Sequence, residues 1–382
     1  MREMTSRQRV EAALNHQEPD RVPLDIGGGQ STSLSVEAYE ALAAKIDVSP
    51  ASAFLNRTFR VARLDEATLV RLGSDVRPVT LGAPKRWSPP PVEPGLLVDE
   101  LGVTWRQAPY SKGYYWEQAT YPLANATIAD LDRYPWPDPD DPGRYEGLAE
   151  EVEALYRETP YALMGDSGYK NHWEVAFTLL GMERALIALA AEEEFIRALL
   201  DRITAIAMTV TRRFLTITGP YLSVFRTSDD LATQRGPLMS PATYRKIIKP
   251  YHQRFFASIK QQTDAKIFYH SCGNVVPLLD DLIEAGVEVL NPVQVAAFAD
   301  PAAVKARYSD RLSFWGGIDT QRVLPYGTPA EVRAEVWLRI RQFGQGGGFV
   351  AAPVHNVQPD VPPENILAMS QAVHELGAYP LQ

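Results

Sequence analysis

The segment IFYHSCGNV, residues 267–275, carries the side chains of this sequence best suited to bind a metal ion. One residue separates His270 from Cys272, which is the only cysteine among 382 residues. In an extended segment, side chains two positions apart point to the same side, so both can approach one ion. Zinc binds imidazole nitrogen and thiolate sulfur, and catalytic zinc keeps one position open. The alternative for this short motif is a buried cysteine beside a capping histidine.

A third metal ligand must come from another strand, and His355 in the segment APVHN is the strongest candidate. Asp229, Asp230 or Asp319 can complete the coordination sphere or orient a ligand. The predicted zinc ligands are therefore His270, Cys272 and His355.

The elements that must position these residues follow a regular pattern after residue 160. Short apolar runs such as YALMGDSG, AKIFYHSCGN and GFVAAPVHN alternate with amphipathic helical stretches, which favours a parallel sheet. The repetition favours a (β/α)8 TIM barrel over a Rossmann fold. Neither G-x-G-x-x-G nor G-x-x-x-x-G-K-[ST] follows any predicted strand, so a nucleotide-binding fingerprint is lacking.

The part of the chain before residue 160 is less regular. A short predicted helix ends before Pro19, and the strand RVPLDIG then runs into a glycine cluster. VDELGVTWRQAP is typical of a β-hairpin, with Leu101-Gly102 at its turn. We interpret residues 1–382 as a single TIM-barrel domain, with an elaborated insertion at 30–150 and regular βα repeats over 160–382.

Polar residues follow the predicted strands at the end where TIM-barrel enzymes carry their active sites. Asp229 and Asp319 are the predicted catalytic carboxylates, as proton acceptors or as groups that orient a ligand. Asn291 and Gln294 are predicted to donate hydrogen bonds to substrate. These positions also suit loop residues or caps, but their recurrence from strand to strand favours a shared site.

A further set of candidate substrate-binding residues follows the strand YALMGDSG. Tyr169, His172 and Glu174 are predicted to face the same pocket, together with Lys170. Packing at the start of a helix is the alternative for His172.

Composition excludes several classes of function. The formal net charge is −9 and no dense Lys/Arg stripe is present, which argues against nucleic-acid binding. No run of about 18 apolar residues predicts a membrane span, and the first residues lack an apolar signal core. A single cysteine excludes an intrachain disulfide. We therefore expect a cytoplasmic enzyme.

Several stretches resemble the uroporphyrinogen decarboxylase superfamily, and together they cover nearly the whole chain. They are RVPLDIGG, TSDDLATQRGPLMSPATYRKIIKPYHQR, FYHSCGNVVPLLDDLIEAGVEVLNPVQ, FWGGIDTQRVLP and GGFVAAPVHNVQPDVPPENILAM. The resemblance implies a single (β/α)8 barrel. It also implies one of two chemistries, since one branch contains cofactor-free decarboxylases of haem biosynthesis and another contains zinc methyltransferases that work with corrinoid proteins.

The methyltransferase branch carries His-x-Cys after one strand and a second Cys before a TP-x-EN segment. His270 and Cys272 match the first half of that pattern. Counting back from residues 362–365, PPEN, His355 lies where the second Cys is expected. The sequence therefore resembles this branch but has His in place of one Cys.

The resemblance implies a zinc-dependent methyltransferase that moves a methyl group between a small methoxyl, thiol or amine compound and a corrinoid protein or thiol acceptor. The cobalamin-binding pattern D-x-H-x-x-G is absent, so a separate corrinoid protein is the expected partner. One thiolate and two neutral imidazoles give a zinc site a net charge near +1, whereas two thiolates and one imidazole give a net charge near zero. The more positive zinc is the stronger Lewis acid, which favours a substrate with an oxygen leaving group.

Two other functions remain open. A decarboxylase of acidic tetrapyrroles needs cations to pair with the carboxylates of its substrate. The segment RVPLDIGGGQSTSLS offers only Arg21, with Arg57 and Arg60 further along the chain, so this function ranks second. A non-catalytic protein of the same fold that binds a small ligand ranks third.

Overall fold

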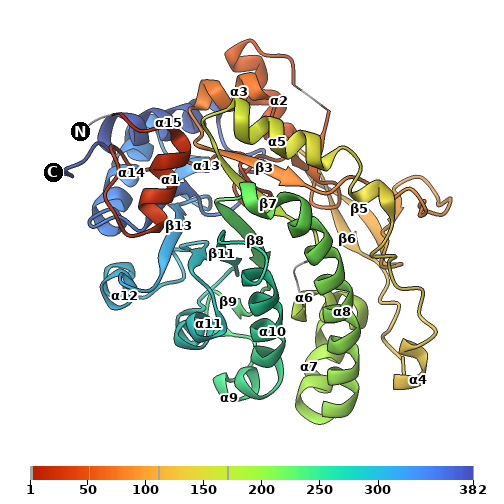
Figure 1. Ribbon diagram of the computed structural model, residues 1–382. Helices are drawn as coiled ribbons and strands as arrows, with labels where there is room; N and C mark the ends of the chain where they lie inside the picture. Colours follow the sequence, from red (N-terminus) through yellow and green to blue (C-terminus); the bar gives the residue numbers. More distant parts are fainter. Residues whose placement is uncertain (1–2, 51, 111, 170–171, 382) are drawn as a thin grey trace.

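The computed structural model describes residues 3–50, 52–110, 112–169 and 172–381 (Figure 1). Seven parallel strands of these residues form one curled sheet in the order β14-β13-β12-β11-β8-β7-β3. The strands are β3 (Val76–Thr80), β7 (Ala162–Asp166), β8 (Val224–Ser228), β11 (Lys266–His270), β12 (Val289–Asn291), β13 (Ser313–Ile318) and β14 (Phe349–Pro353). Nearly every strand residue is buried, as expected for a parallel sheet that is covered on both faces.

Residues 22–26, in the predicted strand RVPLDIG, close the sheet between β14 and β3. Leu24 forms a parallel bridge with Ala351 of β14, and on its other side its carbonyl accepts the Asp75 N–H at 2.8 Å. Side chains take some of the backbone donors of this segment, since the Leu24 N–H donates to Asp75 Oδ2. For that reason the segment forms isolated bridges rather than a continuous ladder. The fold is a (β/α)8 barrel, as predicted.

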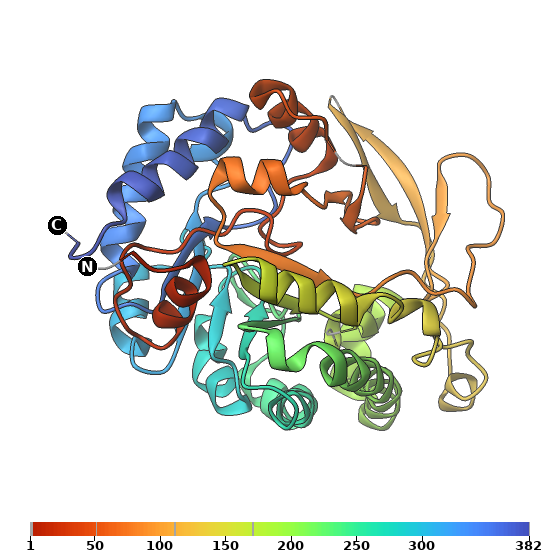
Figure 2. The ribbon, with the colours of Figure 1, turned by 45° about the horizontal axis from the view of Figure 1, so that its top comes forward.

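Helices cover the outside of the barrel (Figures 1 and 2). The longer helices are α1 (Ser6–Leu14), α2 (Val36–Ile46), α3 (Glu66–Leu72), α5 (Leu148–Glu158), α6 (Trp173–Leu180), α7 (Met182–Ala191), α8 (Glu193–Thr218), α10 (Lys249–Lys260), α11 (Leu279–Ala285), α12 (Pro301–Tyr308), α14 (Pro329–Phe343) and α15 (Pro363–Leu376). Short helices are α4 (Ile128–Leu131), α9 (Pro241–Thr243) and α13 (Val323–Tyr326), with a π-helical turn at Tyr244–Ile248 and 3₁₀ turns at Pro142–Arg144, Gly219–Tyr221 and Val276–Leu278.

The predicted β-hairpin is confirmed and forms part of a three-stranded antiparallel sheet beside the barrel (Figure 1). Its strands are β4 (Leu96–Val98), β5 (Thr104–Tyr110) and β6 (Gly113–Gln118). The turn between β4 and β5 holds Gly102 at a φ of 73°, and Asp99 Oδ1 accepts the N–H groups of Leu101 and Val103. Two-stranded pairs are formed by β1 (Phe54–Asn56) with β2 (Val61–Ala62) and by β9 (Ala232–Thr233) with β10 (Gly236–Pro237).

The region 30–150 also contributes a barrel strand, which the interpretation of this region as an insertion missed. β3 pairs in parallel with β7 over its whole length. Its sequence, VRPVT, hides the strand because Arg77 and Pro78 interrupt the apolar pattern. Arg77 is nevertheless buried, where its Nε lies 2.7 Å from Glu66 Oε2 and its guanidinium lies over the Tyr161 ring.

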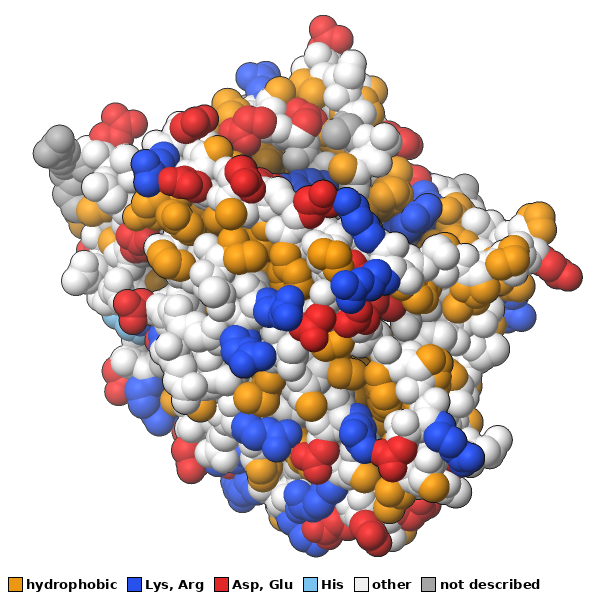
Figure 3. Space-filling view, turned by 45° about the vertical axis from the view of Figure 1, so that its right-hand side comes forward, with side chains coloured by type: hydrophobic (Ala, Val, Ile, Leu, Met, Phe, Trp, Pro, Cys, Tyr) orange, Lys and Arg blue, Asp and Glu red, His pale blue; other side chains and the backbone are white. Residues whose placement is uncertain are grey.

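The described ends of the chain lie side by side, and Arg21 forms an antiparallel bridge with Ala378 (Figures 1 and 2). On the face in Figure 3, Lys and Arg side chains are scattered among Asp and Glu side chains and form no continuous basic surface. None of the helices in the described ranges combines the length and the apolarity that a membrane crossing requires.

Candidate metal centre at the mouth of the barrel

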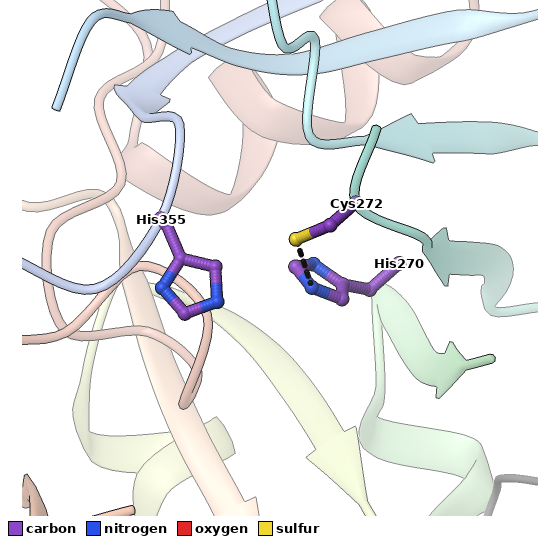
Figure 4. A group of neighbouring side chains, drawn as sticks. All are labelled: His270, Cys272 and His355. Carbon is purple, nitrogen blue, oxygen red and sulfur yellow. Dashed lines mark hydrogen bonds between the residues drawn. The ribbon is translucent and has the colours of Figure 1, made fainter. Parts of the chain in front are cut away.

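The structure brings the three predicted metal ligands together (Figure 4). His270 ends β11, Cys272 lies two residues beyond it, and His355 lies two residues beyond β14. His270 Nε2 is 3.5 Å from Cys272 Sγ, and one ligand atom from each of the three residues lies within 4.8 Å of the others. Curvature of the sheet brings the ends of β11 and β14 together, although two strands separate them.

The side chain of Asn291 holds the ring of His270. Asn291 is fully buried, its Oδ1 lies 2.5 Å from His270 Nδ1, and its Nδ2 donates to the carbonyl of Trp315 at 3.1 Å. Because a carbonyl can only accept, the amide nitrogen faces Trp315 and the amide oxygen faces His270. His270 Nδ1 therefore carries the proton, and the lone pair of Nε2 points at Cys272. Support of this kind orients metal-binding histidines in general.

Cys272 needs a nearby cation to become a thiolate. Burial raises the pKa of its thiol well above the usual range, and the charges of Asp230 and Glu174 raise it further. Asp230 Oδ1 also accepts the Cys272 N–H at 2.8 Å, which fixes the backbone of this residue. A bound metal ion supplies the missing positive charge and deprotonates a coordinating thiol.

His355 is available as a neutral ligand. Much of its surface is exposed, and it lines the cavity at the barrel mouth. Protein atoms still surround the ring, and this burial lowers the pKa of His355, with a further decrease from the charge of Arg226. Two neutral imidazoles and one sulfur form a donor set that zinc accepts, so the residues fit the predicted ion.

The metal centre opens into a cavity of about 530 Å³, a size typical of small-molecule sites. One part of its wall is apolar and includes Phe54, Leu55, Phe59, Val61 and Met164. Within the part of the chain that the structure describes, the charged residues of the wall are Arg144, Asp166, Glu174, Arg226 and Asp230. The cavity therefore offers both charged and apolar surface to a substrate.

Arg226 is a cavity residue that the sequence analysis missed. It lies on β8, is 3% exposed, and contacts Asp166 Oδ2 at 3.1 Å and Ser31 Oγ at 2.5 Å. The signal in the sequence was an arginine inside the segment SVFRTS, which directly precedes Asp229. Buried cations rarely occur unpaired, so this residue pointed to a polar interior.

Two of the predicted substrate-binding residues, Tyr169 and Glu174, line this cavity. The Tyr169 hydroxyl donates to Glu100 Oε2 at 2.6 Å, and burial raises the pKa of Tyr169, so the phenol stays protonated. Lys170, which was expected beside them, lies outside the described residues.

The placement of Asp229 and His172 does not support their predicted roles at a substrate. Both side chains are fully buried, and neither is among the described residues that line the cavity. The Asp229 carboxylate instead accepts the N–H groups of His172, Trp173 and Glu174, at 3.1, 2.8 and 2.6 Å, and so caps helix α6. Successive residues of an extended chain point to opposite sides, so the neighbouring Asp230 faces the cavity.

His172, Asp229 and His252 form a second group whose ligand atoms lie within 4.8 Å of one another. His252 Nε2 lies 3.1 Å from Asp229 Oδ2, and its Nδ1 lies 3.0 Å from the Tyr244 hydroxyl. The Tyr244 hydroxyl can donate to Nδ1, so His252 Nε2 carries the proton that Asp229 accepts. We therefore assign this buried group to the anchoring of α6 and α10.

The other three predicted residues also lie outside the cavity wall. Asp319 is half-buried and accepts the N–H groups of Gln321 and Arg322, so it caps the turn before α13, and this placement does not support its predicted catalytic role. Gln294 Oε1 accepts the Gly273 N–H at 2.6 Å. Asn291 and Gln294 thus hold the two sides of the His270–Cys272 segment, and the structure does not support the prediction that they contact substrate.

Comparison with known proteins identifies the family of this chain and a solved structure with a similar fold. A sequence model of the family described as Uroporphyrinogen decarboxylase (URO-D) matches residues 116–376. The uroporphyrinogen decarboxylase of Psychromonas ingrahamii is 25% identical over 281 residues, which are 69% of this chain and 74% of that protein. The corresponding protein of Aeromonas salmonicida is 26% identical over 282 residues, with coverage of 70% and 74%.

Among solved structures, a methyltransferase from Methanosarcina mazei aligns over 98% of this chain and 99% of its own, with a TM-score of 0.66. At 21% sequence identity, this alignment shows that the two proteins share a fold and no more. The family match covers most of the chain. The chain belongs to the uroporphyrinogen decarboxylase family.

Proposed function

We propose that this protein is a zinc-dependent methyltransferase that moves a methyl group between a small methylated substrate and a corrinoid protein or thiol acceptor. The observation that carries the proposal is the convergence of His270, Cys272 and His355 within 4.8 Å beside a cavity of small-molecule size. The methyltransferase description of the Methanosarcina mazei neighbour agrees with it.

When bound, zinc supplies Lewis-acid chemistry: it polarises an ether oxygen or lowers the pKa of a thiol. Two neutral imidazoles and one thiolate leave the site near +1, which favours a substrate whose methyl group leaves from oxygen. Asn291 keeps the lone pair of His270 Nε2 directed at the ligand position. The carboxyl of Asp230 lines the cavity, and burial raises its pKa, so it can hold a proton near the departing oxygen.

The methyl group would pass to or from a corrinoid held by a separate protein. A partner of this kind must reach the cavity from its open side. Phe54 and Phe59 line the cavity and are 43% and 57% exposed, so they offer apolar contact surface at that side. Exposed apolar residues around a site are typical of contact surfaces.

Tetrapyrrole decarboxylation is the alternative, because the uroporphyrinogen decarboxylases are the relatives at 25–26% identity. The charges of the cavity argue against it. Arg226 pairs with Asp166 and Arg144 pairs with Glu100, so both arginines of the described wall are already neutralised. A substrate with several carboxylates needs cations that remain available to pair with it.

Elemental analysis tests the proposal. Protein purified without chelator should contain about one zinc ion per chain, and Cys272→Ala and His355→Ala should lose it because three protein ligands are the usual minimum for catalytic zinc. His374→Ala is the control, since His374 is exposed on α15. Wild-type protein without stoichiometric zinc would refute the proposal. Decarboxylation of an acidic tetrapyrrole that survives Cys272→Ala would establish the alternative.

A further inference from the structure

A second cavity, of about 250 Å³, lies beside the cavity of the metal centre. Its wall is mainly apolar and includes Leu101, Trp136, Val175, Ile203, Ile206 and Ala207. Several of these side chains, such as Trp136 and Ile206, are only half-buried, so the cavity leaves apolar surface uncovered. Uncovered apolar surface of this kind often marks a binding site. An apolar cavity of about 150 Å³ holds benzene. The side cavity therefore has room for an aromatic ring or a branched alkyl group.

Tyr169 forms part of the wall between the two cavities. Gly168, Tyr169 and Val175 line both of them. The Tyr169 hydroxyl donates to Glu100 Oε2 at 2.6 Å, and the other carboxylate oxygen of Glu100 pairs with Arg144. The Arg144 guanidinium also lies over the Tyr169 ring, 5.0 Å from its centroid. These contacts hold a side chain, which can change rotamer, rather than a fixed backbone wall. Gly168, at a φ of 71°, permits a conformation that other residues rarely adopt.

We propose that the side cavity is an extension of the substrate site and that Tyr169 closes it. It takes the aryl or branched-alkyl body of a methylated substrate whose methyl-bearing atom lies at the metal centre. The difference between the two cavities supports this: Asp166, Arg226 and Asp230 line the cavity of the metal centre, whereas the wall of the side cavity is mainly apolar apart from Asp99 and Glu100. The methyl-transfer part rests on the proposed function, whereas binding of an apolar group does not.

Binding of toluene tests the side cavity. Toluene has an aromatic ring but no methyl ether, so its binding does not depend on the proposed methyl transfer. Ala207 is buried in the wall, so Ala207→Leu fills the space, while Ala205 is exposed on the same helix and Ala205→Leu serves as the matched control. In calorimetric titrations, Ala207→Leu should weaken toluene binding at least tenfold and Ala205→Leu should leave it unchanged. Ile206→Phe provides a second filled variant should Ala207→Leu fail to fold. Toluene binding that is equal in the wild type and a folded filled variant would overturn the proposal.

Tyr169→Phe tests the closing role, because it keeps the ring and removes the hydrogen bond to Glu100. Its association rate for toluene in stopped-flow measurements should rise several-fold, and an unchanged rate would refute the role of Tyr169. The same titrations on Cys272→Ala separate the two proposals. Loss of zinc with toluene binding retained supports both. If the wild type contains no zinc but binds toluene, and Ala207→Leu weakens that binding, the methyltransferase proposal is refuted and the side-cavity proposal is supported.

Discussion

Replacement of Asn291 by Leu would isolate the contribution of the ring orientation of His270 to metal binding. The change removes the acceptor that lies 2.5 Å from His270 Nδ1 and keeps a side chain of similar size. It also removes the donor to the Trp315 carbonyl, but that carbonyl still accepts the Val293 N–H at 3.2 Å. The group that loses this acceptor is therefore the Nδ1–H of a buried histidine.

The size of the effect follows from this geometry. Loss of a group that orients a metal ligand lowers metal affinity by about 10- to 100-fold, or about 1.4 to 2.8 kcal/mol. A buried donor left without an acceptor destabilises the fold by about 1–3 kcal/mol. Two separate readouts, zinc affinity and the free energy of unfolding, should therefore both decrease in Asn291→Leu.

A chelator competition titration measures zinc affinity, and urea unfolding of the metal-free protein measures stability. Asn365→Leu is the matched control, because Asn365 is also buried and donates to the carbonyls of Leu324 and Gly327, and none of these three residues lines the cavity of the metal centre. It should lose stability and keep its zinc affinity. Asn291→Asp should keep most of the affinity, since aspartate still accepts from His270. Zinc affinity within twofold of wild type in Asn291→Leu would refute the orientation argument.

Three further predictions concern single groups. Zinc affinity should rise about tenfold per pH unit between pH 6 and 8 in chelator titrations, because binding must displace the proton of Cys272, whose pKa burial raises; a flat profile would exclude the thiolate. Asp229→Ala should lower the free energy of unfolding by about 1–3 kcal/mol in urea, since it leaves backbone donors of α6 unpaired; an unchanged midpoint would contradict the capping role. Burial raises the pKa of Asp25 to about 6, so the native state binds its proton more tightly than the unfolded chain does. The stability of wild type relative to Asp25→Asn should therefore be greatest below pH 4 and decline by up to about 3 kcal/mol as the pH rises through 6, and a pH-independent difference in urea unfolding would disprove the shift.

Much of the fold was predictable from local pattern. The mainly apolar runs at 162–166, 224–228, 266–270, 289–291, 313–318 and 349–353 are strands, because parallel strands buried on both faces favour apolar residues. The pattern missed β3, in which a buried Arg77 pairs with Glu66. Arg226 did not hide β8, but in β3 Pro78 follows Arg77 directly, so two residues in a row interrupt the apolar pattern.

The candidate metal centre was likewise predictable only in part. The sequence by itself determined which atoms are available for a metal, since His270, Cys272 and His355 are set by residue type and by position at strand ends. Only the tertiary structure decided which neighbours support them. Asp229 and Asp230 are adjacent in sequence, yet one caps a buried helix and the other faces the cavity. Alternation along an extended chain separates the two, and closure of the barrel decides which side becomes the interior of the site.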